Sequence, residues 1–122
     1  DKRRPRANVS EVMNIIGDVH GKTVVLVDDM VDTAGTLCHG AEALMKLGGA
    51  KEVYACATHG VLSGPAIQRL TDSVITETVF LDTIPAREGS DAARIKMLSV
   101  APVFAEAISR IYEDKPVSPL FN

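Results

Sequence analysis

A short apolar run that ends in two carboxylates constrains this chain more than any other stretch. Residues 23–27 read Thr-Val-Val-Leu-Val and follow Gly21. Most of the run is β-branched and it is too short for a solvated helix, so we expect a strand that is buried on both faces. Asp28 and Asp29 come directly after it, and we expect the strand to stop there.

A polar turn and a helix follow the two carboxylates. The turn consists of Asp32, Thr33, Ala34, Gly35 and Thr36. Apolar residues then recur at helical spacing as far as Gly48, which predicts a helix with one face against the sheet. The residues of that face are Leu37, Cys38, Ala41, Leu44 and Met45.

A turn of this kind can bind an anion. The first amides of a helix have no partner within it and lie at the positive end of its dipole, so an anion there receives several hydrogen bonds. Gly35 lets the backbone approach closely, and the hydroxyls of Thr33 and Thr36 add donors. Asp28 and Asp29 would repel a phosphate but can accept hydrogen bonds from the hydroxyls of a sugar. Together these residues suit a ribose 5-phosphate.

On the pattern alone, two alternatives stay open. The turn could serve only as a helix cap beside two solvated carboxylates. A receiver domain also ends a strand with paired aspartates, but a Thr-Ala-Gly-Thr turn directly after the pair is not expected there.

Strands and helices alternate along the rest of the chain. Further strands are predicted at 12–16, 52–58, 78–82 and 95–100. One helix is predicted to begin after Ser63-Gly64-Pro65, with Ile67 and Leu70 facing inward, and another at Pro102. The inward residues of that last helix are Phe104, Ala107, Ile108 and Ile111. The alternation predicts an α/β fold with a three-layer, mostly parallel sheet.

Composition narrows the class of protein. A chain of 122 residues, 46% of them hydrophobic, suits one packed domain. The net charge of -3 gives no general reason to expect a nucleic acid or an anionic membrane as partner. No apolar run approaches the length of a membrane span. Cys38 and Cys56 are expected to be reduced core thiols of a cytoplasmic protein, and no Cys and His pair has the spacing of a zinc site.

The motifs of the chain resemble those of the ribose-phosphate diphosphokinases, or phosphoribosyl pyrophosphate synthetases. Residues 27–36 are similar to the ribose-phosphate loop of the phosphoribosyltransferase-like fold, and Asp32 is typical of the diphosphokinase form. The other motifs agree in order along the chain and are Lys2-Arg3-Arg4, Ile16-Gly17-Asp18-Val19, Thr58-His59-Gly60-Val61-Leu62-Ser63-Gly64-Pro65-Ala66, Asp82-Thr83-Ile84-Pro85 and Val117-Ser118-Pro119-Leu120-Phe121. The resemblance covers essentially the whole chain but only the C-terminal part of such an enzyme.

This resemblance implies a domain organisation and a reaction. Residues 1–8 would be part of a catalytic flexible loop, and residues 9–122 would be the C-terminal phosphoribosyltransferase-like (type I) domain, without the N-terminal domain. The implied enzyme transfers diphosphate from ATP to the 1-hydroxyl of ribose 5-phosphate and forms phosphoribosyl diphosphate and AMP. Mg²⁺ is the implied cofactor, with its ligands expected in the N-terminal domain, so we expect the isolated chain to be inactive.

The resemblance also assigns roles to residues. Lys2 and Arg4 would be catalytic, because an ammonium and a guanidinium can close over the transferring phosphates. Ribose 5-phosphate would be bound by Arg4, Asp28, Asp29, Asp32, Thr33, Ala34, Gly35 and Thr36. Ser118 and Phe121 would contribute to an allosteric site between the subunits of a homohexamer, although Pro116 stands where the family often has Ser.

Other functions remain open beside the diphosphokinase. A phosphoribosyltransferase uses a similar loop but consumes phosphoribosyl diphosphate to glycosylate a base, and Asp32 and His59-Gly60 argue against it. A non-catalytic regulatory homologue would lack the lid residues, whereas Lys2 and Arg4 are present. From composition alone, residues 1–8 could be a solvated basic terminus and residues 114–122 a disordered one. His59 could line the site or be structural.

Overall fold

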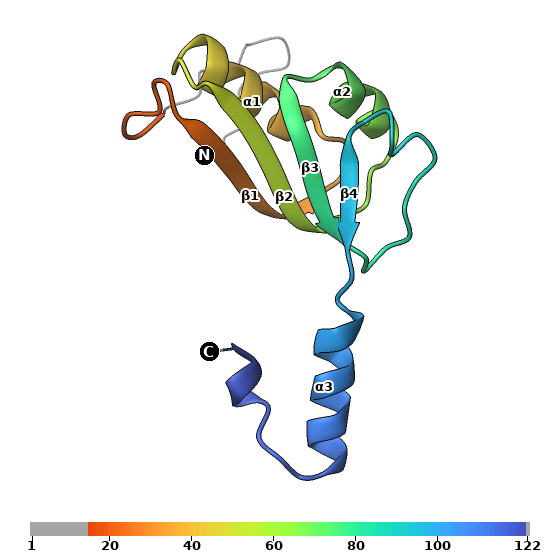
Figure 1. Cartoon of the computed structure of the whole chain (residues 1–122). Coiled ribbons are helices and arrows are strands. Elements are labelled where there is room, and N and C mark those ends of the chain that lie inside the picture. Colours follow the sequence, from red (N-terminus) through yellow and green to blue (C-terminus); the bar gives the residue numbers. More distant parts are fainter. Residues whose placement is uncertain (1–14, 122) are drawn as a thin grey trace, which may run out of the picture.

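The computed structural model describes residues 15–121, and they form a parallel sheet with helices on one face (Figure 1). The strands are β1 (Thr23–Val31), β2 (Glu52–Gly60), β3 (Ile75–Leu81) and β4 (Ile95–Leu98). The helices are α1 (Gly35–Lys46), α2 (Ala66–Asp72) and α3 (Ala101–Tyr112), followed by the 3-10 helix η1 (Ser118–Phe121). The strand predicted at 12–16 lies mostly outside the described residues, and its last two residues are not in a strand.

The four strands are parallel and follow one another in the order β1-β2-β3-β4. Val24 pairs with Val53, Cys56 with Val79, and Phe80 with Met97. The predicted α/β fold with a parallel sheet is therefore confirmed. Because all strands run in one direction, their carboxyl ends meet at a single edge, where open α/β sheets bind ligands.

The hydrophobic core lies between the sheet and the helices α1 and α2. Val53 and Phe80 point into it from the sheet, and Ala41 and Leu70 come from the two helices; all four are almost fully buried. Successive strand residues alternate between the two faces, so each strand contributes every second side chain to this core. This core fixes α1 against β1 and so fixes the position of the turn that joins them.

The other face of the sheet is not covered by any described element. Val25 is 57% exposed and Val27 is 78% exposed, so the expectation that residues 23–27 are buried on both faces is wrong. The physical reason is handedness. Two successive right-handed crossovers that add strands in the same direction place both helices on the same side of the sheet. Among the described residues the domain thus has two layers instead of the predicted three.

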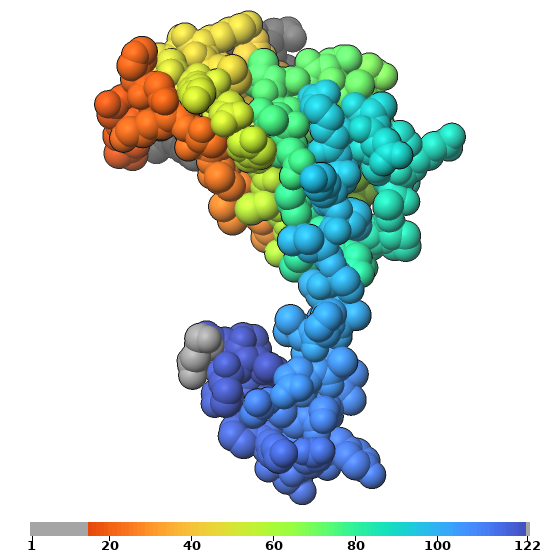
Figure 2. Space-filling view, in the orientation of Figure 1, coloured from red at the N-terminus to blue at the C-terminus, as the bar shows by residue number. Residues whose placement is uncertain are grey.

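The helix predicted at Pro102 exists, but its apolar stripe does not face the core. α3 extends away from the sheet, as Figures 1 and 2 show, and it buries none of its residues. Phe104, Ile108 and Ile111 are exposed, so the prediction that they point inward is wrong within this chain. The period of the sequence identifies an apolar face, but it does not say against what that face packs.

β1 is also longer than predicted. We expected it to stop at the first carboxylate, but it continues to Val31, since Asp28 pairs with Ala57 and Val31 pairs with Gly60. β1 lies at the edge of the described sheet, where exposed carboxylates can reach water without leaving the ladder. The two acids therefore belong to the strand and not to the turn.

Arg94 joins the end of α2 to β3 and β4. Its guanidinium donates hydrogen bonds of 3.0–3.2 Å to the carbonyl oxygens of Leu70, Thr71, Ser73 and Ile75. Carbonyls at a helix C-terminus have no partner within the helix, so this one side chain satisfies several of them. Arg94 itself has a left-handed backbone, with φ of 58°.

We expect Arg94→Ala to lower the free energy of unfolding by about 2 kcal/mol, because several carbonyls lose a charged donor. Arg94→Gly is the control, since it loses the same hydrogen bonds but relieves the left-handed backbone. It should be more stable than the alanine variant by about 1 kcal/mol. Urea denaturation measures both effects, and an alanine variant with the midpoint of the original chain would contradict the expectation.

Asp82 anchors the connection between β4 and α3. Its Oδ1 accepts a hydrogen bond of 2.8 Å from the amide of Val100, and its own amide donates to the carbonyl of Leu98. The bond from Val100 and a second from the Ser99 side chain hold the pKa of the Asp82 carboxyl below its usual value. Asp82 thus fixes the first turn of α3 through a charged acceptor.

This arrangement predicts a pH dependence at the start of α3. Because the pKa of Asp82 is lower in the folded chain, its stabilising contribution is present above the ordinary pKa of about 4 and is lost as pH falls through the lowered value. The amide resonance of Val100 should therefore titrate in acid. In Asp82→Asn this titration should vanish, and an unchanged titration in that variant would show that another group causes it.

Candidate functional site

The turn between β1 and α1 lies at the carboxyl edge of the sheet and is tied to the segment after β2. The amides of Val61 and Leu62 donate to the carbonyl of Val31, at 3.0 and 3.1 Å. The amide of Ser63 donates to the carbonyl of Asp32 at 2.8 Å. These bonds follow from the parallel pairing of β1 with β2, which ends at the same level in both strands.

Ala34 gives the turn its shape. It precedes the first residue of α1, is 4% exposed and has a left-handed backbone with φ of 65°. The sequence pointed to Gly35 as the permissive residue, but Gly35 does not have a positive φ. A left-handed alanine is uncommon because its Cβ approaches the backbone, and nothing in the sequence pattern marks it.

The backbone donors of the turn are available to a ligand. Within residues 15–121, the amides of residues 33–37 donate no hydrogen bond to another group. No side chain caps α1, and no acidic residue lies in its first turn. The alternative in which Asp32 or Thr33 merely caps the helix is therefore not what the geometry shows. These amides and the positive end of the α1 dipole are the groups with which a helix start binds an anion.

The side chains predicted to accompany these donors are accessible. Thr33 and Thr36 are exposed, and so is Asp32. Asp28 and Asp29 are also exposed, and the Oδ1 of Asp28 accepts a hydrogen bond of 2.8 Å from the amide of Asp29. The turn and the two carboxylates are thus consecutive parts of one strand end and one helix start.

The remaining predicted site residues are not near this turn or lie outside the described residues. Lys2 and Arg4 fall outside residues 15–121. Ser118 and Phe121 are in η1, which lies beyond α3 and away from the sheet (Figure 1). Both are exposed. Among residues 15–121, the predicted site residues at this turn are therefore those from 28 to 36, and Ser118 and Phe121 do not join them.

Comparison with known proteins assigns the family. Residues 4–122 match the family model described as the phosphoribosyl synthetase-associated domain. The chain belongs to this family. It is 65% identical over 122 residues to a ribose-phosphate pyrophosphokinase of Clostridium acetobutylicum and 55% identical to that of Bacillus subtilis. In each case all of the chain matches 38% of the relative, so it spans well under half of their length and corresponds to their C-terminal portion.

A solved structure gives the same assignment. The phosphoribosylpyrophosphate synthetase from Mycobacterium smegmatis superposes with a TM-score of 0.75 at 44% sequence identity, over 81% of this chain and 33% of that one. The predicted relationship to the ribose-phosphate diphosphokinases is therefore confirmed.

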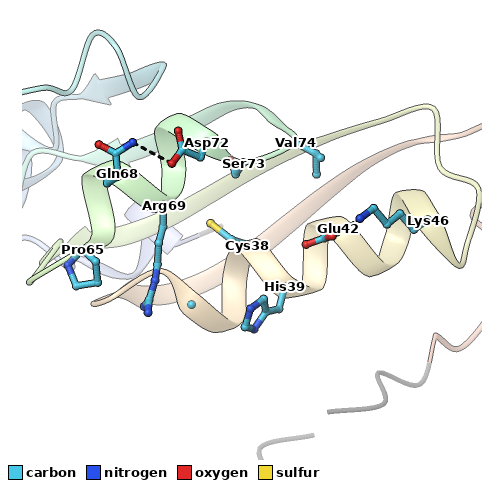
Figure 3. A pocket seen from close by; sticks show the side chains of 11 residues that line it. Cys38, His39, Glu42, Lys46, Pro65, Gln68, Arg69, Asp72, Ser73 and Val74 are labelled. Carbon is cyan, nitrogen blue, oxygen red and sulfur yellow. Dashed lines mark hydrogen bonds and ion pairs between the residues drawn. The ribbon is translucent and has the colours of Figure 1, made fainter. Parts of the chain in front are cut away.

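Arg69 contacts the turn, and the sequence did not predict this contact. Arg69 comes from α2 (Figure 3), and its Nη1 donates a hydrogen bond of 3.1 Å to the carbonyl of Thr33. A Cβ placed on Gly35 would lie 3.1 Å from the same nitrogen. An arginine 36 residues further along the chain carries no local signal that it reaches this turn, because only the crossover between β2 and β3 brings it there.

A hollow of about 370 Å³ runs between α1 and α2, with Gly35 and Arg69 at one end (Figure 3). Cys38 lines it, and burial raises the pKa of this thiol, an effect that the Ser73 hydrogen bond and the Arg69 charge oppose in part. Cys38 is therefore a neutral thiol at neutral pH rather than a nucleophile. Both cysteines are free, as expected.

His59 joins the ends of β2 and β3. Its Nδ1 lies 2.7 Å from the Oγ1 of Thr83, and that hydroxyl donates to the carbonyl of Thr58 at 3.3 Å. The side chain of His59 thus has a hydroxyl partner at the carboxyl edge of the sheet, and Thr83 links it to the backbone of β2.

Residues 15–121 contain neither a cluster of metal-binding side chains nor a membrane-spanning helix. No group of three or more His, Cys, Asp or Glu side chains among them is placed to hold a metal ion. No helix in that part of the chain is long and apolar enough to cross a membrane.

Substitutions at Ala34 test the conformation of the turn. Valine should lower the free energy of unfolding by about 2 kcal/mol, because a β-branched side chain resists φ of this sign and the position has no room for two more methyl groups. Ala34→Gly is the control and should change stability little, since relief of the backbone offsets the lost methyl burial. Thermal and urea unfolding compare the two, and a valine variant as stable as the glycine variant would refute the left-handed assignment.

Proposed function

We propose that this chain provides the ribose 5-phosphate site of a ribose-phosphate diphosphokinase. The observation that carries the proposal is the set of amides at residues 33–37 that have no acceptor within residues 15–121, together with the exposed carboxylates of Asp28 and Asp29 near the end of β1. A phosphate binds to free amides, and the hydroxyls of a sugar donate hydrogen bonds to carboxylates. The names of the relatives, ribose-phosphate pyrophosphokinases, point to the same substrate class.

The role of each group follows from its charge. The amides of the turn and the hydroxyls of Thr33 and Thr36 would hold the 5-phosphate, beside Asp32. Asp28 and Asp29 would orient the ribose by accepting hydrogen bonds from its hydroxyls. Fixing the sugar phosphate in this way turns the diphosphate transfer into a reaction between positioned groups, which is the main contribution a protein makes to phosphoryl transfer.

The complete enzyme would transfer the diphosphate of ATP. The 1-hydroxyl oxygen of the ribose would form a bond to the β-phosphorus as the bond from that phosphorus to the AMP oxygen breaks, and the hydroxyl proton would be released. We propose that Lys2 and Arg4, in a catalytic loop formed by residues 1–8, neutralise the charge on the transferring phosphates, and that residues 9–122 form the C-terminal domain. Mg²⁺ supplies further neutralisation when bound.

Wider features of the enzyme are part of the same proposal. We propose a cytoplasmic homo-oligomer, a homohexamer in the full-length family, with ATP as second substrate and an allosteric contribution from Ser118 and Phe121. No described residue supports nucleic acid or a membrane as partner. A phosphoribosyltransferase would need the same cradle for phosphate. The relatives named above favour the diphosphokinase.

Ribose 5-phosphate binding tests the proposal on the chain itself. In an amide NMR titration, the resonances of residues 33–37 should shift first. Asp28→Asn should weaken affinity about tenfold, which corresponds to one charge-assisted hydrogen bond of roughly 1.4 kcal/mol, while the melting temperature stays nearly unchanged.

The matched control removes the same charge far from the turn. Asp114 is exposed and follows α3, so Asp114→Asn should leave the affinity as it was. Shifts confined to other parts of the chain, or equal affinities of the two variants, would contradict the proposed site. A large drop in melting temperature for Asp28→Asn would favour a structural role of this carboxylate.

A further inference from the structure

The carbonyl groups of three successive residues, from the end of β1 into the turn, accept hydrogen bonds from one other segment of the chain. The carbonyls of Val31 and Asp32 accept hydrogen bonds from backbone amides of residues 61–63, and the carbonyl of Thr33 accepts one from the Nη1 of Arg69. All of these donors belong to the segment from the end of β2 to α2. Arg69 thus extends a backbone ladder by one step with a side chain.

We infer that Arg69 is a positioning residue for the phosphate-binding turn, an inference that rests on the proposed function. A trans peptide unit is planar, and its carbonyl and amide point in opposite directions. Holding the carbonyl of Thr33 toward α2 therefore directs the amide of Ala34 away from α2. This amide is among the unoccupied donors, so Arg69 acts on the ligand through the peptide between Thr33 and Ala34.

The same contact gives Gly35 a second reason to be a glycine. A Cβ at this position would lie 3.1 Å from the Nη1 of Arg69 and 3.7 Å from its Cζ. A β-carbon at position 35 would therefore push the guanidinium aside by a few tenths of an ångström. Figure 3 shows the side chain of Arg69 reaching from α2 toward the start of α1.

The positive charge of Arg69 is not neutralised by an ion pair within residues 15–121. Asp72, one helical turn further along α2, accepts a hydrogen bond from Gln68 instead. A positive group that is not paired with a carboxylate and lies beside a helix N-terminus favours an anion there.

Affinity for ribose 5-phosphate and for inorganic phosphate tests this role. Arg69→Ala should weaken both about tenfold. Arg69→Lys should restore much of the loss, because an ammonium can still donate to the Thr33 carbonyl. The amide resonances of Ala34 and Gly35 should move in the ligand-free alanine variant and return toward their original positions in the lysine variant. Arg110→Ala on α3 removes the same charge at a distant site. It should change neither the affinity for the two ligands nor the amide resonances of Ala34 and Gly35.

A double substitution separates contact from charge. Gly35→Ala should weaken binding severalfold in the original chain, because its methyl group displaces the guanidinium. In the Arg69→Ala background the space is empty, so Gly35→Ala should then have a much smaller effect. Equal effects of Gly35→Ala in both backgrounds would overturn the contact between these two residues.

The outcomes distinguish a failure of the proposed function from a failure of the inference about Arg69. If the original chain binds neither ribose 5-phosphate nor phosphate at the turn, the proposed function fails. If it binds them and Arg69→Ala binds equally well, the inference about Arg69 alone is overturned. Should Arg69→Ala fail to fold, Arg69→Lys and Gly35→Ala decide: a small loss of affinity in the lysine variant and a severalfold loss in Gly35→Ala support the inference, and the original affinity in both variants overturns it.

Discussion

The register between β1 and β2 is the constraint on which the site depends. Because Val31 pairs with Gly60, the next amides along the chain reach back to the carbonyls at the end of β1. In the resulting turn the carbonyls of residues 31–33 accept hydrogen bonds from the protein, whereas the amides of residues 33–37 have no acceptor within residues 15–121.

The turn is held by bonds from its neighbours and not by its own side chains. α1 has no capping side chain, and its first residue is preceded by a left-handed alanine. Such a conformation persists only where the surroundings determine it. Here the surroundings are the segment from 61 to 63 and the guanidinium of Arg69, both contributed by the second crossover.

The chain also has apolar surfaces that its described residues do not cover. One is the open face of β1, where Val25 and Val27 are exposed, and the other is the stripe of α3 that includes Phe104 and Ile108. The sequence predicted both as buried because alternation and helical period report only that a face is apolar. Whether another element reaches that face depends on crossover handedness and on the rest of the molecule.

The sequence by itself determined the order of the described strands and helices and the relationship to the diphosphokinases, and it predicted that residues 32–36 bind an anion. These features are local: a β-branched run, a turn rich in Thr and Gly, and a helical period within a few residues of one another. Only the tertiary structure decided that β1 continues past Asp28, that Ala34 is the left-handed residue and that Arg69 holds the turn. The reason is that each depends on hydrogen bonds to residues more than 25 positions away, and no local pattern encodes such a partner.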